Sequence, residues 1–142
     1  MSETQGTDGP RSQGPQPDAD VVELAGRVFD FARRGQTAEL IGYVDAGVPA
    51  NLTNDRGDTL VMLAAYHGHA EAVAALVARG AEVDRANDRG QTPLAGAVFK
   101  GEDAVIRALL AGGADPHAGT PSAVDTARMF GKTELLALFE AN

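Results

Sequence analysis

Two stretches of the chain, residues 54–68 (NDRGDTLVMLAAYHG) and residues 87–101 (NDRGQTPLAGAVFKG), are related copies of one short module. Both begin with the same tetrapeptide, and the second copy follows thirty-three residues after the first. Glycines keep the same spacing in two further series: Gly35, Gly68 and Gly101, and then Gly47, Gly80 and Gly113. Independent series with one period indicate a repeat protein, in which short units stack because none can bury its apolar face alone.

Within one period, the sequence alternates between helix signals and tight-turn signals. Three hydroxyl side chains stand where they could cap a helix N-terminus: Thr59, Thr92 and Ser122. The apolar spacing predicts one helix over about residues 59–67 and a second over about residues 70–79. Gly68 and Gly80 follow these helices, and glycine readily ends a helix. The polar, turn-prone residues 81–91 are then expected to project as a hairpin-like finger.

These motifs together resemble the ankyrin repeat. The resemblance rests on residues 88–94 (DRGQTPL), 101–102 (GE) and 109–115 (LLAGGAD), and on the matching residues of the preceding unit, 57–84. It extends from about residue 21 to the C-terminus, and the chain is similar to short, stand-alone ankyrin-repeat proteins of bacteria. The resemblance implies an all-α ankyrin-repeat solenoid, a stack of helix–turn–helix units whose fingers stand out at right angles.

The resemblance also divides the chain into a tail and four units. Residues 1–20 are rich in glycine, proline, glutamine and acidic side chains, and we expect them to form a disordered acidic tail. Residues 21–142 are expected to form the ankyrin-repeat domain, in units of about 21–53, 54–86, 87–118 and 119–142. The first unit lacks the threonine–proline start of the family, and the last has a finger about three residues shorter. We therefore expect two internal units between two capping units.

One departure from the family pattern concerns the first helix of each unit. Family members often place a histidine there, and this chain has instead Phe29, Met62, Ala95 and Asp125. Gly96 also lies inside the predicted first helix of the third unit, where glycine costs about 1 kcal/mol relative to alanine. We therefore expect the third unit to be the least stable.

Composition and charge exclude several classes of function. The 142 residues include no cysteine, which excludes disulfides, thiolate metal sites and cysteine nucleophiles. Twelve basic and twenty acidic residues give a net charge of −8, and so negative a chain is not expected to bind nucleic acid or a membrane surface. No apolar run approaches the roughly 20 residues of a membrane span, and the first residues carry no secretory signal. We therefore expect a cytoplasmic protein, and the excess of arginine over lysine suggests a GC-rich bacterial genome.

Side chains that could carry catalysis are scarce. His67, His69 and Glu71 could suggest a metal site, but they straddle a predicted helix end and lack a fourth ligand. His69 stands where the ankyrin family has an inter-helix histidine, which implies a structural role. The sequence contains neither a phosphate-binding glycine loop nor a G-x-S-x-G motif, and Ser122 is better explained as a helix cap. We expect no enzyme activity, no metal and no cofactor.

The repeat predicts which surface residues lie side by side, because residues thirty-three positions apart occupy equivalent places in successive units. The two residues that end each predicted first helix form one row, and in ankyrin-repeat proteins this edge faces the concave groove. The row consists of Arg33, Arg34, Tyr66, His67, Phe99, Lys100, Met129 and Phe130. The finger tips add Asp55, Arg56, Asp58, Asp88, Arg89 and Gln91. Aromatic side chains and arginine often anchor interfaces, so these residues are our candidates for binding a partner.

Each part of this candidate site has a plainer interpretation. Tyr66, Phe99 and Phe130 could cover one another as packing between helices. The near-identity of the two fingers favours a structural role for their tips. Our prediction for the whole chain is a non-catalytic, monomeric module that binds another protein, of unidentified kind, through the groove and the finger tips. The alternative is a regulatory inhibitor or immunity-type subunit that blocks a specific enzyme, since an acidic body suits masking of a basic active site.

Overall fold

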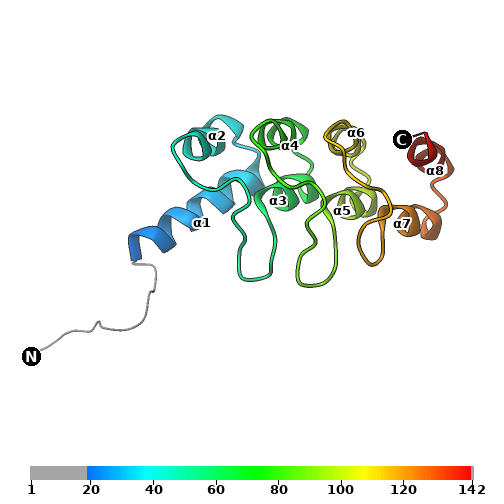
Figure 1. Ribbon diagram of the computed structural model, residues 1–142, viewed down its shortest axis with the longest axis horizontal. Helices are drawn as coiled ribbons and strands as arrows, with labels where there is room; N and C mark the ends of the chain where they lie inside the picture. The colour runs from blue at the N-terminus through cyan, green and yellow to red at the C-terminus, as the bar shows by residue number, and fades with distance from the viewer. Residues whose placement is uncertain (1–18, 142) are drawn as a thin grey trace, which may run out of the picture.

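The chain folds into a row of paired helices (Figure 1). The computed structural model describes residues 19–141, and this range contains eight α-helices and no β-strand. In chain order they are α1 (Ala19–Arg34), α2 (Thr37–Asp45), α3 (Leu60–Tyr66), α4 (Ala70–Val77), α5 (Pro93–Lys100), α6 (Asp103–Ala111), α7 (Ala123–Met129) and α8 (Thr133–Glu140). The all-α class predicted from the sequence is confirmed.

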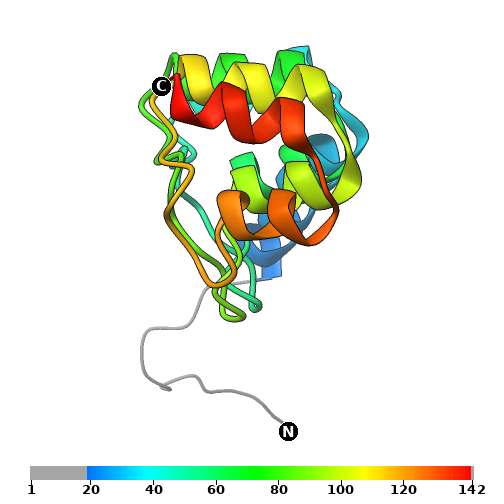
Figure 2. The ribbon, with the colours of Figure 1, turned by 90° about the vertical axis from the view of Figure 1, so that its right-hand side faces the viewer.

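The helices lie in two layers (Figures 1 and 2). Helices α1, α3, α5 and α7 pack side by side in the first layer, and α2, α4 and α6 pack side by side in the second. Helix α8 packs against α7 at the end of the row. The long loops that join one helix pair to the next run beside one another and extend beyond the first layer, as Figure 2 shows. This is the solenoid with projecting fingers that the sequence predicts.

Helix α1 begins before the predicted domain does. Ala19 and Asp20, which the sequence-based division assigns to the tail, lie in its first turn. Its buried side chains are Val28, Phe29 and Ala32, near the C-terminal end where α3 packs against it. The predicted disorder of residues 1–18 falls outside the described residues. The unit limits at residues 53, 86 and 118 remain predictions.

Three helices of the first layer begin at the predicted caps. The hydroxyl oxygens of Thr59, Thr92 and Ser122 accept hydrogen bonds from backbone N–H groups three residues later, at 3.1, 3.2 and 3.0 Å. Each cap satisfies a backbone donor that the helix itself leaves without a partner, and all three residues are buried. Pro93 opens α5 at a position where its missing N–H is not needed. Local sequence therefore sets where these helices start.

Small side chains build the core between the helices. All six residues from Leu60 to Ala65 are buried, so α3 has no solvent face until its last residue. A side chain on Gly96 of α5 would place its Cβ 3.2 Å from Cε of Met62 and 3.5 Å from Cδ1 of Tyr66. The glycine that weakens α5 as an isolated helix thus lets α3 and α5 approach closely. Whether the third unit is the least stable stays a prediction.

His69 joins the first helix pair to the second. Its Nε2 donates a hydrogen bond to the carbonyl oxygen of Arg33, at 2.8 Å. Its ring lies directly over Gly35, which ends α1 in the left-handed region at φ +70°. Because no side chain larger than hydrogen fits beneath the ring, the glycine and the histidine require each other. The structural role predicted for His69 is confirmed by this contact.

Two of the fingers are each held by one asparagine. Oδ1 of Asn54 accepts hydrogen bonds from the backbone N–H groups two and four residues later, at 2.9 and 3.0 Å. Asn87 repeats this pattern in the next finger, with both distances at 3.0 Å. Nδ2 of Asn87 also donates to Oδ1 of Asp58, at 2.9 Å, and so links the two fingers. The recurring asparagine and the glycine three residues later therefore have a structural explanation.

Candidate functional site

The predicted row lies at the C-terminal ends of the first-layer helices. Arg33 and Arg34 end α1, Tyr66 ends α3 and His67 follows it, Phe99 and Lys100 end α5, and Met129 ends α7 and Phe130 follows it. These ends come together because each helix stops at the same point of the period and its neighbour packs alongside. The structure therefore places the eight residues in one strip across the stack.

Large apolar side chains in this strip are open to solvent. The exposed fractions of Phe99, Met129 and Phe130 are 55%, 68% and 48%. The rings of Phe99 and Phe130 touch edge to face, with centroids 5.8 Å apart. Phe99 and Phe130 therefore cover each other in part, but about half of the surface of each residue stays exposed to solvent. Exposed apolar side chains in contact with one another are more often found at interaction surfaces than scattered single ones.

A first cavity, the apolar pocket, opens between the strip and the fingers. Its volume is about 420 Å³. Its wall combines side chains from α3, α5 and α7 with residues of two fingers: Tyr66, Arg89, Gln91, Ala95, Phe99, Thr120, Pro121, Thr126 and Met129. Four wall residues were not predicted as site residues from the sequence: Ala95, Thr120, Pro121 and Thr126. The shortened last finger hides the register that relates Pro121 to Gln91.

A second cavity, the basic pocket, lies one unit nearer the N-terminus and measures about 170 Å³. Three arginines and a histidine from different elements line it: Arg33 of α1, Arg56 and Arg89 of successive fingers, and His67 after α3. Asp58 is the acidic side chain in its lining, and that carboxylate already accepts a hydrogen bond from Asn87. Tyr66, Arg89 and Gln91 line both pockets, so the two cavities are neighbours in one groove.

The electrostatics of the strip are positive, in contrast to the acidic chain. The pKa of His67 is lowered, chiefly by partial burial of its ring and further by the positive charges of His69, Lys100 and Arg33. Nζ of Lys100 lies 4.9 Å from the ring centroid of Tyr66, where the electron-rich face of the ring favours a cation. Within residues 19–141, Arg33 pairs with Asp30 at 2.8 Å, whereas Arg56, Arg89 and Lys100 form no ion pair.

The finger tips form a third cavity. Asp55, Arg56, Asp58, Asp88 and Arg89 line it together with Asn87, and its volume is about 370 Å³. All but Asn87 are among the predicted finger-tip candidates. Gln91 lies instead in the groove, as a wall of the apolar and basic pockets. Arg34, Lys100 and Phe130 belong to the strip but line none of these three cavities.

Comparison with known proteins identifies the repeat. A family model described as ankyrin repeats, in three copies, matches residues 29–120. The chain belongs to the ankyrin-repeat family. It is 45% identical over 67 residues to PA3287 of Pseudomonas aeruginosa, a protein named for its ankyrin repeats, and the match spans 47% of this chain and 37% of that protein. The human ASB11 ankyrin repeat domain superimposes with a TM-score of 0.69 at 28% identity, covering 81% of this chain and 53% of that domain.

Membership of the ankyrin-repeat family indicates a general role for the groove. Ankyrin repeats are protein–protein interaction modules, typically without catalytic activity. In the part of this ankyrin-repeat chain that the structure describes, no group of three or more histidine, cysteine or acidic side chains could hold a metal ion. No helix between residues 19 and 141 is both long and apolar enough to cross a bilayer.

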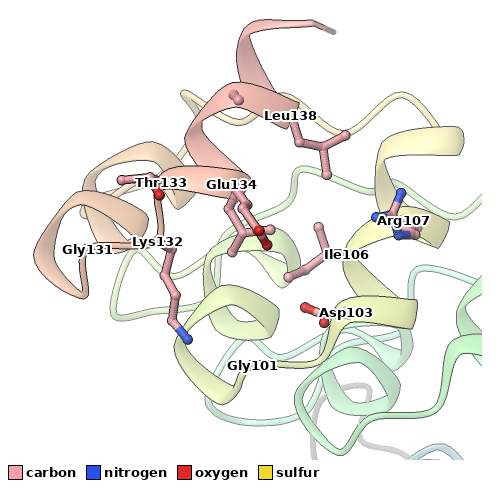
Figure 3. Close-up of a pocket in the computed structure, with 11 residues that line it drawn as sticks. Gly101, Asp103, Ile106, Arg107, Gly131, Lys132, Thr133, Glu134 and Leu138 are labelled. Atoms are coloured by element: carbon pink, nitrogen blue, oxygen red, sulfur yellow. The ribbon is translucent and has the colours of Figure 1, made fainter.

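A further cavity of this ankyrin stack lies away from the groove. Figure 3 shows it between α6 and α8, where its volume is about 800 Å³. Asp103 and Arg107 face it from α6, Lys132 and Glu134 from the start of α8, and Ile106 and Leu138 form its apolar floor. We call this cavity the outer cleft. No sequence motif predicts this cleft, which forms because α8 does not lie as close to α6 as α4 does.

Proposed function

We propose that this ankyrin-repeat chain binds a protein partner along the groove formed by the helix-end strip and the fingers. The observation that supports this most directly is the exposure of Phe99, Met129 and Phe130 beside the apolar pocket. A partner side chain inserted there would remove apolar surface from water on both sides, which stabilises a complex by about 25 cal/mol per Å².

Rigidity of the scaffold favours this use. The groove residues stand on helices whose opposite ends are capped, and His69 and the hydrogen bonds between fingers hold neighbouring units together. A surface that is already formed loses little conformational entropy when a partner binds. Two further parts of the proposal, a monomeric state and a cytoplasmic location, rest on the sequence alone.

The experiment compares what wild-type and variant proteins capture from the native cell. The double variant Tyr66→Ala/Phe99→Ala removes two walls of the apolar pocket, and Phe99→Ala/Met129→Ala removes two side chains that are already exposed. We expect both to capture at least tenfold less of the partner identified with wild type, by quantitative mass spectrometry. Tyr43→Ala is the control, since it removes an aromatic ring that stacks on Phe31 outside the groove.

The outcome also separates the alternative function. If all variants capture the same proteins equally well, the groove is not the binding surface. An inhibitor or immunity-type role would be favoured by capture of one basic enzyme whose activity falls on binding and returns at high salt.

A further inference from the structure

The basic pocket concentrates positive charge in one place of an acidic chain. Arg33 reaches it from α1, and Arg56 and Arg89 reach it from two successive fingers. Across residues 19–141, neither Arg56 nor Arg89 uses its guanidinium in a hydrogen bond or ion pair, and both side chains are exposed. Cations without a bound counter-charge favour an anionic group of a partner, because guanidinium groups bind carboxylates with directed hydrogen bonds.

The apolar pocket lies directly beside it. The two cavities share Tyr66, Arg89 and Gln91, and the apolar pocket is centred one unit further along the stack. Packed helices are spaced by about 10 Å. An extended chain advances about 3.3 Å per residue, so about three residues of partner bridge the two pockets.

We propose that the groove selects an extended segment of a partner protein in which acidic side chains lie about three residues from a bulky apolar side chain. This inference rests on the proposed function and specifies its partner. The acidic side chains occupy the basic pocket, and the apolar side chain occupies the pocket walled by Tyr66, Phe99 and Met129.

Carboxylates fit this site better than more highly charged anions. Asp58 lines the basic pocket, and Asp55 and Asp88 lie close by in the finger cavity. The whole chain has a net charge of −8, which repels nucleic acid and other polyanions at longer range. Single carboxylates gain the contacts with the arginines while meeting less of this repulsion.

A defined probe tests the specificity. The immobilised protein, with its full sequence, is used to select from a phage-displayed library of random 16-residue peptides, and the enriched peptides are then synthesised. We expect enriched peptides to carry two or more Asp or Glu residues about three positions from Leu, Phe, Met or Trp. Replacing their acidic residues with Gln or Asn should weaken binding about tenfold, as should raising the salt from 50 to 500 mM.

Matched variants locate the contact. Arg56→Gln/Arg89→Gln removes two positive charges from the groove, and we expect about tenfold weaker binding of the enriched peptides. Arg107→Gln/Lys132→Gln removes the same charge from the outer cleft and should change binding by less than twofold. Circular dichroism melts should show both variants folded, because the exposed guanidinium groups of Arg56 and Arg89 form no hydrogen bond or ion pair within residues 19–141.

The results distinguish the two proposals. Enriched peptides that lose affinity in Phe99→Ala/Met129→Ala but not in Arg56→Gln/Arg89→Gln, or that lack acidic residues, overturn the acidic specificity and leave the groove as the binding surface. No enrichment, or enriched peptides that ignore both variants, contradicts the groove itself.

Discussion

The glycines that end the first helices share a left-handed backbone conformation, but different side chains pack against them. Gly35, Gly68 and Gly101 end the first helices of three successive units with φ of +70°, +84° and +74°. The ring of His69 covers the first and the carboxylate of Glu102 covers the second, whereas nothing lies within 4 Å of where a Cβ would stand on the third. The three glycines are therefore equivalent in sequence, but their packing environments differ.

This difference predicts unequal costs for the same substitution. In Gly101→Ala the only cost is that alanine must adopt the left-handed backbone conformation, which is less favourable by about 1–2 kcal/mol for residues other than glycine. Gly35→Ala has the same backbone cost, and its Cβ also displaces the His69 ring. The ring then loses its hydrogen bond to the carbonyl of Arg33, which lowers the free energy of unfolding by about 1 kcal/mol more. We expect urea unfolding to show Gly35→Ala as the more destabilised variant. Equal losses would mean that the ring moves aside without cost.

The fingers are elements whose shape comes from side chains as much as from backbone. Two of them are closed by an asparagine that accepts two backbone N–H groups, and neighbouring fingers are tied by backbone hydrogen bonds. One runs from the N–H of Asp88 to the carbonyl of Arg56 and another from Thr120 to Gly90, both at 3.0 Å. The exposed arginines thus stand on a braced support.

Substituting the two asparagines tests how far the fingers stabilise one another. Asn54→Ala removes the contacts within one finger, and Asn87→Ala removes the equivalent contacts together with the hydrogen bond from Nδ2 to Asp58. We expect Asn87→Ala to lower the free energy of unfolding by about 1 kcal/mol more than Asn54→Ala does. Faster hydrogen exchange at the amide of Gln91 should accompany it. A smaller loss for Asn87→Ala would show that the fingers do not support each other.

At the scale of the whole molecule, the stack is loosest at its C-terminal end. Helix α4 buries Ala72, Val73 and Leu76 between two neighbours of its own layer, whereas Phe139 is the fully buried residue of α8. The outer cleft separates α8 from α6. Repeat proteins gain stability from interfaces between adjacent units, so a missing interface lowers the stability of the unit that lacks it.

Hydrogen exchange should reveal this gradient. Amides of α8 are expected to exchange through local opening at lower free energy than those of α4, which should open only with the rest of the stack. The measurement is native-state exchange by mass spectrometry or NMR at increasing low concentrations of denaturant. Protection of α8 equal to that of α4 would contradict the assigned weakness of the last interface.

The helix caps, the glycines that end helices and the row that carries the binding candidates could be predicted from the sequence alone. These signals involve only a few neighbouring residues and repeat with the period, so they can be recognised in the sequence without a structure. The convergence of Arg33, Arg56, His67 and Arg89 on one pocket, the place of Pro121 in its neighbour, and the cleft beside α8 needed the tertiary structure. They depend on how closely successive units pack, and that spacing is set by side chains such as Met62 against Gly96, far apart in sequence.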